Sequence, residues 1–293
     1  MLTCQLMGGL GNQLFQIFTT ISYALRSDNS FVFPNVAWLD VKRHTYWNTL
    51  FIKLSPFLRS SINLPITIRE KEFKYNDLDI NRMRGENVCI SGYFQSYKYF
   101  QDNYTLIYDI LGIDKFRERF VSTPFLFEKS NGSMCISNAQ SCKIDKTNDT
   151  ISLHFRLGDY KGIEHVHPIM PYKYYFDSLQ MINERKPANY TVLFFCEEQD
   201  IFCVTNTVEK IKLDFPSFNF IRASNEMEDW EQMLMMSCCS HNIIANSSFS
   251  WWGAYFNTSP DKIVCFPSLW FGPQLSGHDT SDLCPDTWTK IQI

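Results

Sequence analysis

MLTCQLMGGLGNQLFQIFTTISYALR, residues 1–26, is the stretch of sequence that decides the fold class. Its first six residues are mostly apolar, and three glycines fall within the next five. Over 12–26 the apolar side chains recur at steps of three and four residues, the period of an amphipathic helix. A strand, a glycine turn and a helix in this order are typical of the start of an α/β domain.

The second half of the chain alternates short strands with helices. Runs rich in β-branched and aromatic residues predict strands at 151–155, 190–195, 218–221, 241–245 and 262–266. Helices are predicted between them at 172–184, 228–237 and 249–257. This alternation is typical of a parallel sheet with helices on both faces, so we predict a Rossmann-like second half.

Domain organisation follows from length and from one polar stretch. A chain of 293 residues fits two domains. Residues 129–150 contain few large apolar side chains, which favours a boundary or a long surface loop there. We predict an N-terminal Rossmann-like domain over 1–148 and a C-terminal one over 149–293.

Composition excludes several classes of protein. The chain carries 27 Lys and Arg against 31 Asp and Glu, a net charge of −4, and has no basic cluster, so no nucleic acid partner is expected. No run of 18 apolar residues occurs, so no transmembrane segment is expected. The first residues do not resemble a secretion signal, so we expect a cytoplasmic protein. Ten scattered cysteines without CxxC spacing favour reduced, buried thiols over a zinc site.

The first candidate site is the glycine turn Gly8–Gln13. Glycines between a strand and a helix let a ligand approach the backbone, and a helix N-terminus favours anions. Leu14 stands where a dinucleotide fingerprint needs its third glycine, which argues against a nicotinamide dehydrogenase, and no P-loop ending follows. The alternative is a tight turn with no ligand.

The second candidate site is LHFRLGDY, residues 153–160, at the carboxyl end of a predicted strand. Strand alternation places His154 and Arg156 on one side and Phe155 on the other. The Arg156 guanidinium suits phosphate or carboxylate, and Asp159 stands where the chain turns. The alternative is an Arg156–Asp159 ion pair that only stabilises the turn.

The third candidate site is NSSFSWWGA, residues 246–254, again after a predicted strand. Asn and Ser are good N-caps, so a helix should start within 246–248. Its free backbone N–H groups and nearby hydroxyls would bind an anion without a metal. The alternative is a capped helix with no ligand, and we expect Trp251 and Trp252 to pack in the core.

Two weaker patterns have simpler interpretations. Asp77 and Asp79 have the spacing with which metal-dependent sugar transferases hold a cation, but they lie in a polar stretch that predicts a solvated loop. His165 and His167 could ligate a metal, but no third ligand is evident. We therefore expect no metal site.

Taken together, four segments resemble the α-1,2-fucosyltransferases of glycosyltransferase family 11. They are MGGLGNQLFQ (7–16), SGYFQSYKYF (91–100), HFRLGDY (154–160) and CSHNIIANSSFSWWGAYF (239–256), in the family's order. The resemblance implies an α/β fold of GT-B type, with two Rossmann-like domains facing across a cleft. It also implies an inverting, metal-independent transfer of L-fucose from GDP-β-L-fucose to the 2-hydroxyl of a galactoside glycan acceptor, without a cofactor.

The same resemblance assigns roles to residues. Arg156 is similar to the family's essential arginine and would bind the donor diphosphate, with His154 near the nucleotide. Asp159 is the first candidate for the general base, or it orients Arg156; Glu164 and His165 are further candidates for the base. The expected donor-binding residues are Gly9, Gly11, Asn12, Gln13, Asn246, Ser247, Ser248, Phe249 and Ser250.

The chain departs from the family pattern at three places. Leu157 replaces a second arginine that is common in the family. Gln232 stands where many members have an acid that pairs with guanine, with Glu228, Asp229 and Glu231 as nearby substitutes. The strand after Tyr190 ends in FFCEE rather than in an FSDD-like sequence. Transfer of another 6-deoxy-L-hexose, such as L-rhamnose from a UDP- or dTDP-sugar, therefore stays open, as does a non-catalytic sugar- or nucleotide-binding protein.

Overall fold

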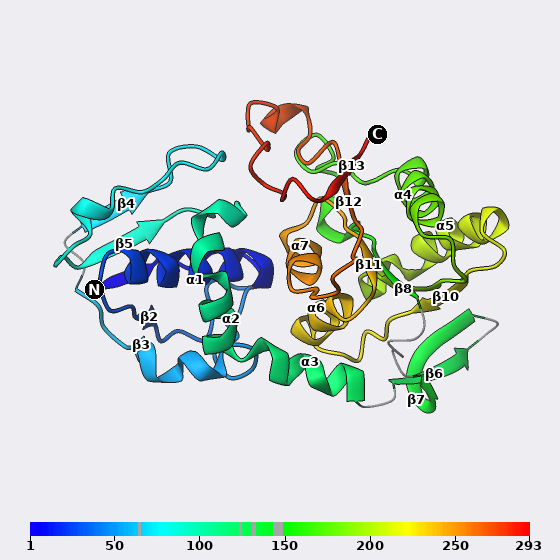
Figure 1. Ribbon diagram of the computed structural model, residues 1–293, viewed down its shortest axis with the longest axis horizontal. Helices are drawn as coiled ribbons and strands as arrows, with labels where there is room; N and C mark the ends of the chain where they lie inside the picture. The colour runs from blue at the N-terminus through cyan, green and yellow to red at the C-terminus, as the bar shows by residue number, and fades with distance from the viewer. Residues whose placement is uncertain (64–65, 123–124, 131–132, 143–148) are drawn as a thin grey trace. The chain divides into compact units, whose positions relative to one another are not determined.

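The computed structural model of the chain describes residues 1–63, 66–122, 125–130, 133–142 and 149–293, with side chains outside 121–148 (Figure 1). The chain forms two compact units: Met1–Lys115 with His278–Pro285, and Phe116–Gly277 with Asp286–Ile293. The domain boundary predicted at 148 and 149 borders residues 143–148, which lie outside the described residues, and it stays a prediction. We describe unit 1 and unit 2 separately.

Unit 1 is built on short parallel strands. Strand β5 (Val88–Ser91) lies between β1 (Leu2–Cys4) and β4 (Ile66–Arg69), and both pairings are parallel. A second parallel pair, β2 (Phe33–Pro34) and β3 (Leu58–Arg59), is joined to β1 by a bridge at Leu2 and Phe31. The carboxyl ends of β1, β5 and β4 therefore lie at one edge.

Helix α1 (Leu10–Arg26) confirms the strand, turn and helix predicted from the first residues. Gly8 has φ +74°, and a Cβ there would lie 2.4 Å from the Asn12 Nδ2 atom, so the turn requires glycine. Both faces of α1 are covered, because its residues from Leu10 to Ala24 are buried except Asn12.

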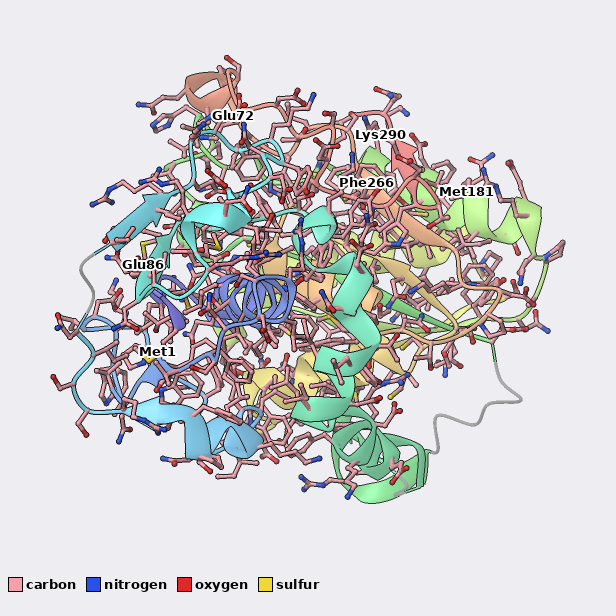
Figure 2. The ribbon with its side chains drawn as sticks, turned by 60° about the vertical axis from the view of Figure 1, so that its left-hand side comes forward. Met1, Glu72, Glu86, Met181, Phe266 and Lys290 are labelled. Atoms are coloured by element: carbon pink, nitrogen blue, oxygen red, sulfur yellow. The ribbon has the colours of Figure 1, made fainter. Side chains whose placement is uncertain are left out.

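The rest of unit 1 packs around this helix and sheet. Helix α2 (Tyr104–Leu111) contacts α1 and ends at Gly112, which has φ +66°. The segment 278–285 returns to this unit, where the carbonyl of Asp282 accepts a hydrogen bond from Ser96 Oγ at 2.6 Å. At the start of the chain, the Met1 amine donates to the Glu86 carbonyl at 2.6 Å, and Figure 2 labels both residues.

Unit 2 contains an eight-stranded sheet. Every neighbouring pair is parallel except β6 and β7. The order across the sheet is β13 (Thr289–Ile291), β12 (Val264–Pro267), β11 (His241–Ile243), β8 (Thr150–His154), β9 (Thr191–Phe195), β10 (Asn219–Arg222), β7 (Ser133–Cys142) and β6 (Phe125–Ser130).

Helices cover both faces of this sheet. Figure 1 shows α4 (Tyr172–Arg185) and α5 (Ile201–Asp214) on one side, with α6 (Asp229–Ser237) and α7 (Ser248–Tyr255) on the other. Helix α3 (Ile113–Ser122) contains the change from unit 1 to unit 2. The α/β fold of GT-B type is confirmed, with parallel strands in each of two units; the predicted facing of two domains across a cleft stays a prediction.

Aromatic side chains cover both faces of the sheet near β8. Phe155 packs towards α4, with its ring centroid 4.3 Å from that of Tyr175. On the opposite side, Trp251 and Trp252 of α7 are fully buried, which confirms their predicted packing role. Near the edge, the Lys290 ammonium lies 5.8 Å from the centroid of Phe266, and Figure 2 labels this pair.

Two sequence-based expectations differ from the structure. The long loop predicted over 129–150 is wrong for its described part, because β6 and β7 pair as an antiparallel hairpin at the sheet edge. Strand β7 contains one β-branched residue, Ile136, and no aromatic residue, so its composition gives little strand signal. Helix α5 escaped prediction because Phe202 and Leu213 are about four-fifths exposed, at 78% and 82%, which blurs the helical period.

Candidate functional site

The candidate donor site lies at the carboxyl edge of the sheet in unit 2. Strands β11, β8, β9 and β10 are consecutive neighbours and run in the same direction. The segments that follow them therefore leave from the same edge, which is where open α/β sheets bind ligands. These segments carry the predicted residues 154–160, 229–232 and 246–250.

Arg156 is held by two carboxylates. Its Nη2 atom donates to Asp159 Oδ1 at 2.5 Å, and its Nη1 atom donates to Glu197 Oε1. The Arg156 side chain is 21% exposed, so solvent or a ligand reaches the guanidinium. The predicted Arg156–Asp159 ion pair is present, but Glu197, after β9, is a second partner that sequence reasoning missed.

The turn that carries Arg156 is stabilised by a buried acid. Asp200 is fully buried, and its carboxylate accepts from the Gly158 backbone N–H and from Lys161 Nζ, both at 2.6 Å. Gly158 has φ +29°, and a Cβ there would lie 2.4 Å from Glu197 Oε2. The turn therefore needs glycine, because the Glu197 carboxylate occupies the space of a side chain.

Tyr160 connects this turn to the loop that follows the neighbouring strand β11. The Arg156 guanidinium carbon lies 5.2 Å from the Tyr160 ring centroid, a cation–π distance. The Tyr160 hydroxyl donates to the Asn246 carbonyl at 3.0 Å, and burial raises its pKa to about 12, so it stays protonated. Tyr160 thus links Arg156 to the 246–250 segment, through a cation–π contact on one side and a hydrogen bond on the other.

His154 lies on the α7 side of the sheet, as strand alternation predicts. Its ring centroid is 5.6 Å from that of Phe249. Burial, with a smaller contribution from the Arg156 charge, lowers the pKa of His154 to about 3. At neutral pH the imidazole is therefore uncharged, so Arg156 rather than His154 supplies positive charge here.

The predicted helix start within 246–248 is confirmed. Helix α7 begins at Ser248, and the hydroxyl of its N-cap Ser247 accepts from the Phe249 N–H at 3.3 Å. Asn246 uses its amide group to donate to the carbonyls of Pro168 and Trp270, at 3.0 and 3.1 Å. Asn246 thus shapes the loop, whereas Ser247 and Ser248 form the N-terminal turn of the helix, where a positive partial charge favours anions.

The residues expected near guanine lie at the start of α6. Gln232 donates to the Met227 carbonyl at 3.1 Å, and Asp229 Oδ1 accepts from the Trp230 N–H at 2.7 Å. Glu228 and Glu231 form a capping box, each accepting a backbone N–H at the helix start. All four side chains therefore make local hydrogen bonds at the start of α6, and base contact by Gln232 and Asp229 stays a prediction.

The glycine-turn residues Gly9, Gly11, Asn12 and Gln13 belong to unit 1. Gly9 is the N-cap of α1, and a Cβ there would lie 3.7 Å from an Arg43 Nη1 atom. Gln13 is buried and donates to the carbonyls of Gly8 and His44, at 3.1 and 2.8 Å. Gln13 therefore stabilises the turn itself, and Asn12 is the partly exposed polar side chain on it.

The weaker acidic and histidine patterns have structural partners. Asp77 pairs with Arg26 at 3.1 Å and accepts from the Tyr23 hydroxyl, so the predicted solvated loop is partly anchored. Asp79 caps a short helix by accepting from the Asn81 N–H at 3.0 Å. The part of the chain that the structure describes contains no group of three or more His, Cys, Asp or Glu side chains arranged for a metal ion.

His165 and His167 have structural contacts as well. The His167 ring stacks on Tyr160 with centroids 4.7 Å apart. The His165 carbonyl accepts from the Gln274 N–H at 3.0 Å. Glu164, which with His165 is a further candidate for the base, accepts from the Gly162 N–H at 3.1 Å and is exposed. Of the three residues considered as the general base, Asp159 is the one that is hydrogen-bonded to Arg156.

Among the described residues, no helix is both long and apolar enough to cross a membrane. The acids Glu197 and Asp200 were missed by sequence reasoning although they follow a predicted strand. The available signal was the FFCEE ending of that strand, since acids at a carboxyl strand end face the same edge as Arg156.

Comparison with known proteins places the chain in a family. The family model described as Glycosyl transferase family 11 matches residues 1–271, and the chain belongs to this family. It is 34% identical over 146 residues to the O-antigen biosynthesis glycosyltransferase WbnK of Escherichia coli, a match that covers 49% of this chain and 45% of WbnK. It is 25% identical over 309 aligned positions to an α-1,2-colitosyltransferase of Escherichia coli, covering 98% of both. The enzyme class is therefore glycosyltransferase, which acts on a nucleotide-sugar donor and a glycan acceptor.

Solved structures also show some likeness to the chain, at low sequence identity and with TM-scores below 0.5. A mutant of Arabidopsis thaliana FUT1 in complex with GDP is 10% identical, with a TM-score of 0.48 and coverage of 90% of this chain and 69% of that one. A glycosyl transferase family 9 protein from Veillonella parvula is 13% identical, with a TM-score of 0.46 and coverage of 100% and 84%.

Proposed function

We propose that the chain transfers L-fucose from GDP-β-L-fucose to the 2-hydroxyl of a galactoside glycan, with inversion and without a metal ion. The observation that carries the proposal is Arg156, a partly exposed guanidinium at the carboxyl end of β8. Its Tyr160 neighbour is hydrogen-bonded to the segment that starts α7. A cation and a helix N-terminus at one sheet edge suit a diphosphate.

The reaction needs charge stabilised on one side of the sugar. The acceptor oxygen forms a bond to C1 of fucose while the bond from C1 to the phosphate oxygen breaks, and GDP leaves with added negative charge. Arg156 and the N–H groups around Ser248 would stabilise that charge, as a metal ion does in other transferases. The acceptor proton passes to a base.

Asp159 is the proposed base, and its alternative role is to orient Arg156. Its carboxylate is 51% exposed and bonded to Arg156, so donor binding has to loosen that contact before Asp159 can accept a proton. One variant distinguishes the role of Asp159 as a base from its role in orienting Arg156. An Asp159→Asn variant that keeps donor affinity but loses transfer supports the base, whereas one that loses donor affinity supports orientation.

The remaining roles are proposals of the same kind. Ser247, Ser248, Phe249 and Ser250 would contact the phosphates, with Asn246 shaping their loop. Gln232 and Asp229 would contact guanine, and uncharged His154 would lie near the nucleotide. Gly9, Gly11, Asn12 and Gln13 of unit 1 would border the reacting sugars.

A second donor is favoured by a specific observation. The relative that matches 98% of this chain is named an α-1,2-colitosyltransferase, and colitose is also a 6-deoxy sugar. Transfer of colitose from its nucleotide sugar is therefore the second candidate function. L-rhamnose from a UDP- or dTDP-sugar and a non-catalytic binding role are the further alternatives that the departures at Leu157 and Gln232 leave open.

The experiment that separates these functions is thermal unfolding against nucleotides. The purified protein is heated with GDP, UDP, dTDP or NAD at equal concentration, without metal. Selective stabilisation by GDP supports a GDP-sugar donor, and turnover of GDP-fucose against GDP-colitose then distinguishes the two sugars. Stabilisation by UDP or dTDP instead would refute the GDP-fucose proposal, and stabilisation by NAD would refute the transferase site.

A further inference from the structure

The turn Gly92–Gln95 lies within the SGYFQSYKYF motif and is not among the residues proposed for the donor site. It follows β5, the central strand of the three-stranded parallel sheet in unit 1. Glu70 follows the neighbouring strand β4, and the glycine turn of α1 follows β1. All three segments leave from the carboxyl edge of this sheet, where α/β sheets bind ligands.

A carboxylate holds this turn in an unusual conformation. Glu70 Oε2 accepts from the Tyr93 N–H at 2.7 Å, and Glu70 Oε1 accepts from the Phe94 N–H at 2.9 Å. Phe94 is fully buried and has φ +52°, in the left-handed region that bulky residues avoid. Such backbone strain persists where neighbouring contacts enforce it, and it is concentrated at ligand sites.

The absence of a side chain at Gly92 leaves room for the Glu70 carboxylate, which we call the Glu70 clamp because it holds the Tyr93 and Phe94 N–H groups. A Cβ on Gly92 would lie 2.4 Å from the Glu70 Cβ atom and 2.6 Å from its Oε2 atom. The carboxylate therefore sits where a larger residue would place its side chain. Because both of its oxygens are engaged by backbone N–H groups, Glu70 serves to fix the turn.

The fixed turn presents groups that suit a sugar. Tyr93 is 42% exposed, and its side chain has no ring contact or hydrogen bond with the described residues. Two positions on, Gln95 donates from its amide nitrogen to Asn12 Oδ1 at 2.8 Å, which joins the turn to the start of α1. An exposed aromatic ring and an amide pair are thus held on rigid backbone at a ligand-binding edge.

We propose that the Gly92–Gln95 turn is a saccharide subsite, in which Tyr93 packs against a ring of the glycan acceptor and the Gln95–Asn12 amides bind its hydroxyls. This inference rests on the proposed transferase function. An aromatic face is apolar and accommodates the C–H face of a sugar, and amides offer both donors and acceptors to hydroxyl groups. A neutral polyhydroxylated ligand fits these uncharged groups, whereas a diphosphate requires a cation such as Arg156.

The test uses two variants and a matched control. Tyr93→Ala and Gln95→Ala remove the two groups, and Gln101→Ala removes an exposed glutamine of the same unit outside the turn. The acceptor KM for methyl β-D-galactoside should rise about tenfold in Tyr93→Ala, the size of one lost aromatic contact. In Tyr93→Ala, hydrolysis of GDP-fucose without acceptor should match wild type, which shows that the fold and donor site are intact.

Direct glycan binding keeps this test separate from the donor assignment. Saturation-transfer NMR measures contact between methyl β-D-galactoside and each protein without any donor. Loss of the signal in both turn variants, with retention in Gln101→Ala, supports the subsite even if GDP-fucose proves to be the wrong donor. Equal signals in wild type and Tyr93→Ala, or no signal in wild type, would overturn it.

Discussion

Replacing Arg156 by alanine is the most informative single change in the donor site. Its two terminal nitrogens donate to Asp159 and Glu197, so both are oriented at the edge of the sheet. With a bound donor, the same two N–H groups would face the diphosphate. Charge-assisted hydrogen bonds contribute about 1.5–3 kcal/mol each, so losing two should lower kcat/KM by roughly 10²- to 10⁴-fold.

The fold should tolerate this change. Asp159 and Glu197 are 51% and 40% exposed, so water solvates both carboxylates once Arg156 is gone, and the cost to stability should stay within about 1 kcal/mol. The assay is GDP release from GDP-fucose with a galactoside, alongside thermal unfolding. Arg185→Ala, an exposed cation at the end of α4, is the control and should keep full activity. A folded Arg156→Ala protein with more than about a tenth of the wild-type rate would refute the assigned role.

Three further predictions concern metal, pH and the turn glycine. EDTA should leave transfer unchanged in a GDP-release assay, and a loss restored by manganese would contradict metal-independent chemistry. Burial lowers the pKa of His154 to about 3 and of His241 to about 4, so both are neutral when folded and protonate on unfolding. Urea unfolding should therefore show a loss of about 2 kcal/mol per histidine between pH 7 and pH 5, and a flat stability profile would disprove this linkage. Gly158→Ala should displace the Glu197 carboxylate, which holds Arg156, and should therefore lower the transfer rate. The control is Gly162→Ala, which has φ +86° and open space around it and should affect stability alone. Equal transfer rates in the two variants would contradict the role of Glu197 in holding Arg156.

Much of unit 2 could be predicted because its strands are buried on both faces. The runs at 151–155, 190–195, 218–221, 241–245 and 262–266 correspond to β8, β9, β10, β11 and β12. Continuous apolar runs report such burial directly. Helix α5 lacks that signal because apolar Phe202 and Leu213 face outward.

The candidate site could be predicted only in part, because some of its contacts depend on long-range strand pairing. Motifs placed Arg156, Asp159 and the α7 start at one edge, because each follows a buried parallel strand. The Glu197 contact depends on the pairing of β8 with β9, a long-range feature that local sequence does not encode. The Glu70 clamp on the turn at 92–95 was hidden for the same reason, since it joins the ends of β4 and β5.

The central claim is tested most directly by analysing the product formed from GDP-β-L-fucose and methyl β-D-galactoside in EDTA. NMR of the purified product reports the position and anomeric configuration of any new linkage. The account predicts an α-linked fucose on the 2-hydroxyl of galactose, because an inverting transfer converts the β-linked donor into an α-glycoside. A β-linked product, a different linkage position, or transfer only from GDP-colitose or a UDP- or dTDP-sugar would contradict it.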